Sequence, residues 1–270
     1  MKDTRVITEQ QFQLVRDWLY QRSGIFLNAS KKSLVTGRLH KRLIEVEARD
    51  FGDYLRLLQQ PEFEQEAQLA LNLLTTNETY FFREPKHFEF IEQLLSSGQL
   101  SKRARILSAA ASSGEESYSL ALTMAAHVGV HEPWQILGTD INTRVLQHAQ
   151  HAIYPIADSS KIKSEWLKAF CVKGVRKDEG WFRIGPQVRQ HVQFQQHNLM
   201  TPLETSQKFD LILLRNVLIY FELADKKQIV QHMINALKPG GFLLVGHSES
   251  IHGYDARLQQ LKPACYQVLA

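Results

Sequence analysis

The 270-residue chain is 44% hydrophobic, with a formal net charge of +4 and a pI near 9.0. This composition predicts one large folded domain or two small ones and excludes an intrinsically disordered chain. Cys171 and Cys265 stand far apart and in no metal-ligand spacing, which argues against a disulfide scaffold and a zinc site. The sequence has no secretory N-terminal segment and no apolar run of membrane length, so we expect a cytoplasmic protein.

Helical patterns fill the chain before residue 75. The first predicted helix has a capping residue at Thr8 and ends at Gly24. A second helix is predicted over residues 31–49, because apolar residues recur there at helical spacing. They are Val35, Leu39, Leu43 and Val46. Two further helices are predicted in FGDYLRLLQQ and PEFEQEAQLALNLLT, the latter with Pro61 near its start.

Four basic residues of the second predicted helix share one stripe. At 100° per residue they fall within about 40° of one another. They are Lys31, Arg38, Arg42 and Arg49. A solvated face is the ordinary interpretation of such a stripe. Nucleic-acid binding is another, which the lack of interleaved aromatic residues weakens.

The segment TTNETYFFRE, at residues 75–84, combines threonines, an asparagine, three aromatic residues and an arginine. Neither a surface loop nor a core helix requires this composition. We therefore expect the segment to have a function of its own.

Strand and helix patterns alternate from about residue 100 onward. Five strands are predicted, in ARILSAAAS, WQILGTDI, HVQFQQHNL, KFDLILLRN and GFLLVGHSES. Helices between strands indicate a parallel, doubly wound sheet. The alternation lapses between Pro155 and His191, where we predict a small insertion with a hairpin.

Polar residues follow four of these strands, and ligands of such sheets bind at the carboxyl ends of the strands. Glu115 follows the turn at Gly114. Asp140 can accept hydrogen bonds from both hydroxyls of an adenosine ribose, or it can cap the next helix. Asn198 and Asn216 can pair with an adenine or stand in ordinary turns. Neither GxGxxG nor GxxxxGK[ST] is present, so the set favours a nucleoside cofactor without phosphates, namely S-adenosylmethionine (SAM).

Five segments together resemble the CheR family, the chemoreceptor glutamate O-methyltransferases of bacteria. They are TTNETYFFRE, AAASSGEESYSLAL, GTDINTRVLQHAQ, FDLILLRNVLIYF and LKPGGFLLVGHSES. The resemblance implies an α/β fold: a doubly wound, Rossmann-like SAM-dependent methyltransferase domain, an all-helical N-terminal domain and a small inserted β-subdomain. The implied boundaries are a receptor-recognition domain at 1–74, a linker folding over the cofactor at 75–100, a catalytic domain at 101–270 and the insertion at 157–192.

The resemblance also assigns site residues by motif position. The implied cofactor contacts are Asn77, Thr79, Arg83, Glu115, Asp140, Asn198, Leu199, Asn216 and Val217. Arg83 and Tyr220 are the expected catalytic residues. Arg83 would pair with a carboxylate, either that of SAM or that of the incoming glutamate, unless it only pairs with Glu84 or another surface acid. The three aromatic residues at 80–82 would bury the linker and exclude water.

The expected reaction makes modest demands on the protein. A glutamate carboxylate is ionised near neutral pH, so we expect neither a catalytic base nor a metal, and a structural role for His247. The product would be S-adenosylhomocysteine.

The implied partner is the cytoplasmic helical domain of chemoreceptors. Side chains on one face of its coiled-coil helices recur every seven residues, which suits the basic stripe as a substrate-binding surface. The glycine-poor loop KGVRKDEG favours an enzyme that does not dock a receptor C-terminal peptide. We expect a monomer without a nucleic-acid partner and without membrane insertion.

Two alternatives remain at this point. One is a SAM-sensing or scaffold protein of the same fold. The other is an RNA or DNA methyltransferase, which would suit the pI but lacks a [DN]PP[YF] motif.

Overall fold

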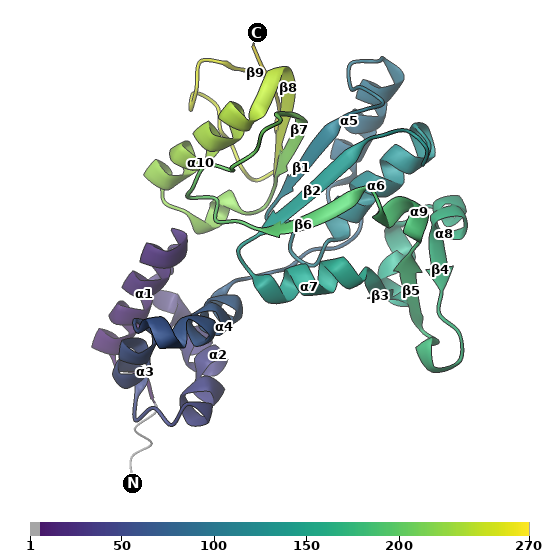
Figure 1. Ribbon diagram of the computed structural model, residues 1–270. Helices are drawn as coiled ribbons and strands as arrows, with labels where there is room; N and C mark the ends of the chain where they lie inside the picture. The colour runs from purple at the N-terminus through teal and green to yellow at the C-terminus, as the bar shows by residue number, and fades with distance from the viewer. Residues whose placement is uncertain (1–5, 270) are drawn as a thin grey trace. The chain divides into compact units, whose positions relative to one another are not determined.

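The computed structural model describes residues 6–269, and the chain divides into two compact units (Figure 1). The first unit contains the residues up to Thr76 together with Tyr220–Asp225. The second contains Asn77–Ile219 and the residues from Lys226 onward.

The first unit is helical, and each of its four predicted helices forms. They are α1 (Glu9–Ser23), α2 (Lys32–Glu45), α3 (Phe51–Leu58) and α4 (Glu64–Leu74), with 3-10 turns η1 (Ala29–Lys31) and η2 (Pro61–Phe63). Thr8 and Gln11 close a capping box at the start of α1, and Gly24 ends that helix at φ 73°. The capping and breaking residues therefore mark the helix ends as predicted.

The second helix is shorter than predicted. It ends at Glu45, and Glu47 adopts a left-handed φ of 57°. Arg49 consequently lies beyond α2, so the prediction that it shares one helical stripe with Lys31, Arg38 and Arg42 is wrong. The local sequence lacks a glycine or proline to announce this stop.

The second unit contains a seven-stranded sheet in the order β6-β2-β1-β7-β8-β10-β9. The five predicted strands form its parallel part, which contains β1 (Arg105–Ala109), β2 (Gln135–Asp140), β6 (Val192–Gln196), β7 (Phe209–Leu214) and β8 (Leu237–Val245). The antiparallel strands β9 (Leu258–Lys262) and β10 (Cys265–Val268) were not predicted from the sequence.

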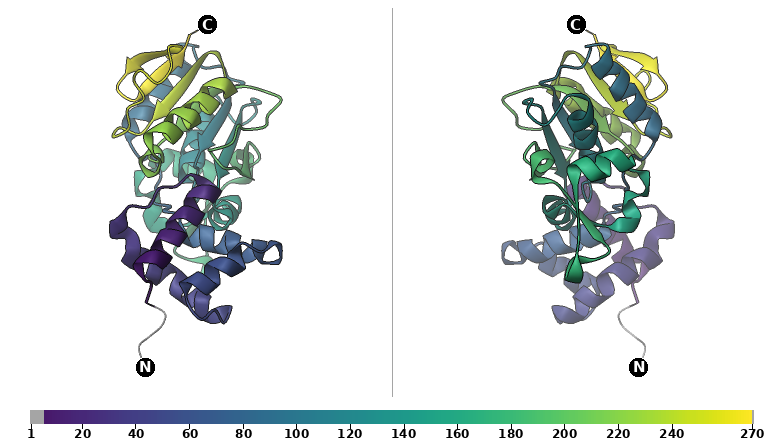
Figure 2. Two further views of the ribbon diagram at one scale, coloured as in Figure 1. Left: turned by 90° about the vertical axis from the view of Figure 1, so that its left-hand side faces the viewer. Right: turned by 90° about the vertical axis from the view of Figure 1, so that its right-hand side faces the viewer.

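Helices cover both faces of this sheet, which makes it doubly wound (Figures 1 and 2). They are α5 (Pro85–Ser96), α6 (Glu115–His127), α7 (Thr143–His151) and α10 (Leu223–Ala236). The residues of α5 were predicted to be part of a linker. In the structure α5 contacts α6 and buries Phe88, Ile91 and Leu94 in the core of this unit.

A smaller sheet is inserted after α7. Its antiparallel strands, in the order β3-β5-β4, are β3 (Ile153–Pro155), β4 (Cys171–Lys173) and β5 (Trp181–Ile184). The connecting elements are η3 (Ile156–Lys161), α8 (Ser164–Phe170), η4 (Arg176–Asp178) and α9 (Pro186–Arg189). The predicted hairpin is β4 and β5, joined by the loop that contains η4.

Across residues 6–269, no helix has both the length and the apolar character that crossing a bilayer requires.

Candidate functional site

The loops that follow β1, β2, β6, β7 and β8 lie at the carboxyl edge of the parallel sheet. In a doubly wound fold this edge is where ligands bind. All the polar strand-end residues singled out in the sequence therefore lie on one side of the second unit.

Asp140 joins two of these loops. Its side chain is buried, with 8% exposed, and its two oxygens accept hydrogen bonds from the backbone N–H groups of Ser112 and Asn142, each at 2.9 Å. Asn142, rather than Asp140, caps α7 by accepting from Arg144 N and Val145 N. The capping interpretation of Asp140 is therefore wrong, and its carboxylate instead fixes the turn after β1.

Glu115 begins α6 directly after that turn. Ser113 Oγ donates to its carboxylate at 2.7 Å, and burial raises the pKa of Glu115 to about 7. Gly114 precedes it at φ 97°, where an added Cβ would lie 2.8 Å from Ala149 Cβ. A glycine is therefore required at this turn by both backbone conformation and space.

The segment at residues 77–84 is attached to the same edge. Ser112 Oγ donates to Asn77 O, and Phe82 N donates to Ser119 Oγ, both at 2.9 Å. Phe81 is fully buried, with its ring centroid 5.0 Å from that of Tyr154. Tyr80 is 45% exposed, so the expectation that all three aromatic residues bury the linker is wrong for this residue.

Arg83 remains within its own segment. One of its Nη atoms donates to Glu78 O at 2.8 Å, and its guanidinium carbon lies 5.7 Å from the centre of the Tyr80 ring. The carboxylate of Glu84 accepts hydrogen bonds from Arg215 and Asn216 instead. Thr79 is half-buried in the same segment.

The loop after β7 is held by a buried acidic residue, Glu249, that was not predicted from the sequence. The carboxylate of Glu249 accepts from the backbone N–H groups of Asn216, Leu218 and Gly246, at 2.7, 2.8 and 2.7 Å. Glu249 is buried, with 7% exposed. The available signal was an acidic residue in GHSES, directly after a buried strand. Asn216 itself adopts a left-handed φ of 56°, and Val217 beside it is half-buried.

Replacing Glu249 with alanine is expected to lower the free energy of unfolding by about 3 kcal/mol or more, because three buried N–H groups lose their acceptor. Thermal and urea denaturation measure this loss. Glu204→Ala, at an exposed acidic position, is the control and should change stability by less than about 0.5 kcal/mol. Equal stabilities of the two variants would contradict this account of Glu249.

The loop after β6 contains Asn198 and Leu199. Asn198 Oδ1 accepts from Met200 N at 3.0 Å, which is the turn that the ordinary interpretation of this residue predicted. Leu199 is buried, and its carbonyl oxygen lies 3.1 Å from His232 Nδ1.

The remaining predicted site residues belong to the first unit. Tyr220 ends the turn η5 (Leu218–Tyr220), and its carbonyl accepts from Phe26 N at 2.8 Å. Arg38 donates to the carbonyls of Leu74 and Thr75, at 3.0 and 2.9 Å.

The other basic residues of the stripe differ in their surroundings. Arg42 pairs with the buried Glu66, Arg49 pairs with Asp53 at 3.0 Å, and Lys31 is exposed. Two of the four predicted receptor-binding cations thus pair with acidic side chains of their own unit, and Arg38 binds backbone carbonyls.

Glu84, His87 and His247 place ligand-type atoms within 4.8 Å of one another. His87 is 1% exposed, and burial lowers its pKa to about 3, so the ring is neutral. Glu84 already accepts hydrogen bonds from Arg215, Asn216 and the backbone of His247. A cation there would compete with the Arg215 guanidinium for the same carboxylate, so the arrangement favours an ion pair over a metal site.

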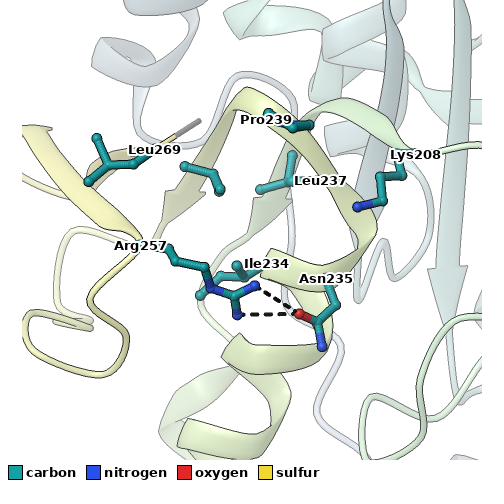
Figure 3. Close-up of a pocket in the computed structure, with 8 residues that line it drawn as sticks. Lys208, Ile234, Asn235, Leu237, Pro239, Arg257 and Leu269 are labelled. Atoms are coloured by element: carbon teal, nitrogen blue, oxygen red, sulfur yellow. Dashed lines mark hydrogen bonds between the residues drawn. The ribbon is translucent and has the colours of Figure 1, made fainter.

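A pocket shown in Figure 3 lies elsewhere in the second unit. Arg257 and Asn235, which line it, are joined by hydrogen bonds of 3.2 and 3.3 Å. None of the predicted site residues lines this pocket.

Comparison with known families decides the assignment. A model described as CheR methyltransferase, SAM binding domain, matches residues 77–266, and one described as CheR methyltransferase, all-alpha domain, matches residues 10–75. The chain belongs to the CheR methyltransferase family. It is a SAM-dependent methyltransferase of the chemotaxis type, with the fold class predicted from its sequence.

Curated relatives agree with this assignment. The chemotaxis protein methyltransferase of Escherichia coli (strain K12) is 35% identical over 259 residues, covering 95% of this chain and 90% of the relative. Chemotaxis protein methyltransferase 2 of Pseudomonas aeruginosa is 37% identical over 246 residues, covering 90% and 87%. The chemotaxis protein methyltransferase of Borreliella burgdorferi is 33% identical over 274 residues, covering 97% and 95%.

The residues at the carboxyl edge of this CheR protein suit SAM. The cofactor carries an ammonium and a sulfonium and no phosphate, and the buried carboxyl groups of the edge include Glu115 and Asp140. The Asp140 carboxylate accepts hydrogen bonds from backbone N–H groups at both oxygens, and with about four acceptor sites it can accept another from a ribose hydroxyl.

Proposed function

We propose that this CheR protein transfers a methyl group from SAM to the side-chain carboxylate of glutamates in the cytoplasmic helical domain of chemoreceptors. The products are a glutamate methyl ester and S-adenosylhomocysteine. The names of the relatives support a chemotaxis substrate, and the resemblance of the TTNETYFFRE and RNVLIYF segments supports the glutamate ester.

The observation that carries this proposal is the hydrogen bonding of the Arg83 guanidinium. Its guanidinium donates to the neutral carbonyl of Glu78 and forms no ion pair with a carboxylate of residues 6–269, although the segment that contains it is fixed to the carboxyl edge. Its charge is therefore available to an incoming carboxylate. Arginine suits this role because its planar fork can bind both carboxylate oxygens.

The mechanism then consists mainly of positioning. Bound SAM supplies an electrophilic methyl group. Asp140 holds the ribose, Glu115 attracts the cationic part of the cofactor, and Arg83 orients the glutamate carboxylate, which is already ionised. Phe81 anchors the segment from its buried position. Asn77, Thr79, Asn198, Leu199, Asn216 and Val217 complete the proposed cofactor contacts, and Tyr220 is a second proposed catalytic residue. Lys31, Arg38, Arg42 and Arg49 remain the proposed receptor-binding cations.

Labelling with SAM that carries a tritiated methyl group tests the proposed substrate. Purified protein is incubated with membranes that contain the chemoreceptors of its host. Label on a receptor-sized band that mild base releases as methanol supports the proposal. Tight SAM binding by calorimetry without any labelled protein would favour the scaffold alternative, and label in an RNA fraction would favour the nucleic-acid alternative.

SAM affinity is expected to rise with pH through about 7. Burial raises the pKa of Glu115 to about 7, so the group is mostly protonated below that pH and, as it ionises with rising pH, attracts the cationic cofactor. In the unliganded protein the same pKa shift makes folding stability fall, rather than rise, with increasing pH. Because the folded state holds this proton more tightly, stability decreases as pH rises from the ordinary pKa of 4.5 towards 7.

Calorimetric titration of SAM across this pH range measures the effect. The Glu115→Gln protein, in which this side chain cannot ionise, should bind SAM more weakly at high pH. Its SAM affinity should no longer rise with pH. The matched control is Glu204→Gln, at an exposed acidic position. An unchanged profile in Glu115→Gln would exclude Glu115 as the group responsible.

A further inference from the structure

Arg215 is the most completely buried charged side chain at the carboxyl edge, with 1% of its side chain exposed. It directly follows β7, so the strand fixes its backbone. Burial of an arginine is costly unless each charge and donor has a partner, and such a residue therefore calls for an explanation.

The guanidinium of Arg215 joins three parts of the second unit. One Nη donates to Glu116 in α6 at 2.8 Å. The other donates to the Glu84 carboxylate at 3.0 Å and to the backbone carbonyl of Arg83. The planar fork thus spans from helix α6 to the turn that carries Arg83.

The two acidic partners are themselves held in place. Glu116 accepts from Ser108 Oγ in β1 at 2.7 Å. Glu84 accepts from Asn216 Nδ2 at 3.1 Å and from the backbone N–H of His247 at 3.2 Å. The clasp formed by Glu84, Arg215 and Glu116 therefore connects the segment at residues 77–84 to β1, α6 and the loops after β7 and β8.

The backbone at this clasp is strained. Phe82, Glu84 and Asn216 are not glycines, yet they adopt φ values of 54°, 57° and 56°. Such conformations cost free energy and persist only where surrounding contacts impose them, typically at functional sites. The contacts of Arg215 with Arg83 O and Glu84 are among those that hold this turn.

We propose that Arg215 is a positioning residue: it clamps the Arg83–Glu84 turn and thereby sets the place of the 77–84 segment beside bound SAM. This inference rests on the proposed role of that segment and adds a residue to which no cofactor or substrate contact is assigned. Lysine cannot reproduce these contacts, because its three N–H donors share one nitrogen, whereas Arg215 makes them from two nitrogens held apart in a rigid planar fork.

The test compares Arg215→Lys with Arg105→Lys. The guanidinium of Arg105 also binds a backbone carbonyl, that of Gln207. Its guanidinium carbon lies 4.3 Å from the centre of the Phe209 ring. Arg105, however, begins β1 and therefore lies at the opposite edge of the sheet. Both variants are first checked for native circular dichroism. SAM affinity is then measured by calorimetry, kcat and KM by receptor methylation, and the exposure of residues 80–84 by hydrogen exchange.

Arg215→Lys is expected to lower kcat by about a hundredfold through misplacement of the segment, to weaken SAM binding and to speed amide exchange at residues 80–84. Arg105→Lys should leave all three within about twofold of wild type, as expected for a change remote from the site. A folded Arg215→Lys protein with wild-type SAM affinity and wild-type exchange at residues 80–84 would overturn the proposal.

A second variant and two measurements that need no methyl acceptor complete the test. If Arg215→Lys does not fold, Glu116→Gln is used, because it removes the charge at the α6 end of the clasp and leaves Glu84 in place. It should show the same changes in smaller measure, and wild-type behaviour would contradict the clasp. Calorimetry and hydrogen exchange need no methyl acceptor, so they test the clasp even if no receptor is methylated. Absence of receptor methylation would refute the proposed function and would leave the test of the clasp unaffected.

Discussion

Replacing Arg83 with alanine is expected to lower kcat for receptor methylation by about a hundredfold to a thousandfold, the usual range for loss of one charge-stabilising donor. The structure leaves this guanidinium bound to one neutral carbonyl, so its removal deprives no buried acid of a partner. The free energy of unfolding should therefore change little. Steady-state methylation kinetics and thermal denaturation measure the two effects separately.

The control is Arg257→Ala, which removes an arginine that pairs with Asp255 at the β9 end of the same unit. It should retain wild-type kcat. Arg83→Lys tests whether charge alone suffices, since lysine keeps the cation and loses the fork. Wild-type kcat in Arg83→Ala would remove Arg83 from the mechanism.

Replacing Asp140 with alanine is expected to weaken SAM binding by about a hundredfold, which corresponds to about 3 kcal/mol. Two losses add in this variant. The cofactor ribose loses a charged acceptor, and the turns at Ser112 and Asn142 lose the carboxylate that accepts their N–H groups. Calorimetry gives the affinity, and denaturation gives the loss of stability.

The neighbouring residue Asn142 provides a matched control. Asn142→Ala removes the cap of α7 and should cost about 1 kcal/mol of stability while leaving SAM affinity near that of wild type. If Asn142→Ala weakened SAM binding as much as Asp140→Ala did, the effect would come from the disturbed turn rather than from contact with the cofactor.

Local signals in the sequence were sufficient for much of the architecture. Thr8 and Gly24 marked both ends of α1, and the apolar runs before Asp140 and Asn216 marked the central strands. These features depend on neighbours in sequence, which is why they could be predicted. Because the strands are parallel, the polar residues that follow them reach one edge.

The features that were missed depend on distant contacts. The strand β9 shows little apolar alternation because its residues after Leu258 are all exposed, and α5 begins at a proline after a left-handed Glu84. Glu249 looks like an ordinary polar residue until the loops after β7 and β8 meet. Its partner Asn216 lies far away in the chain, so no local pattern indicates the contact.

The basic stripe is a pattern that the sequence suggested and the structure does not contain. Regular spacing suggested one helical surface through Arg49, but α2 ends at Glu45, and Arg42 is engaged by Glu66. Spacing alone cannot show where a helix stops or which acids of the same unit will neutralise its cations. Receptor binding by these four residues stays a prediction.

Mass spectrometry of receptor peptides after incubation with this CheR protein and SAM would test the central claim most directly. The proposal predicts methyl groups on glutamate side chains of the cytoplasmic helices, removable by mild base and absent when Arg83→Ala replaces the wild-type protein. Methylation confined to lysine or arginine nitrogens, or unmodified receptors beside a SAM-bound protein, would contradict it.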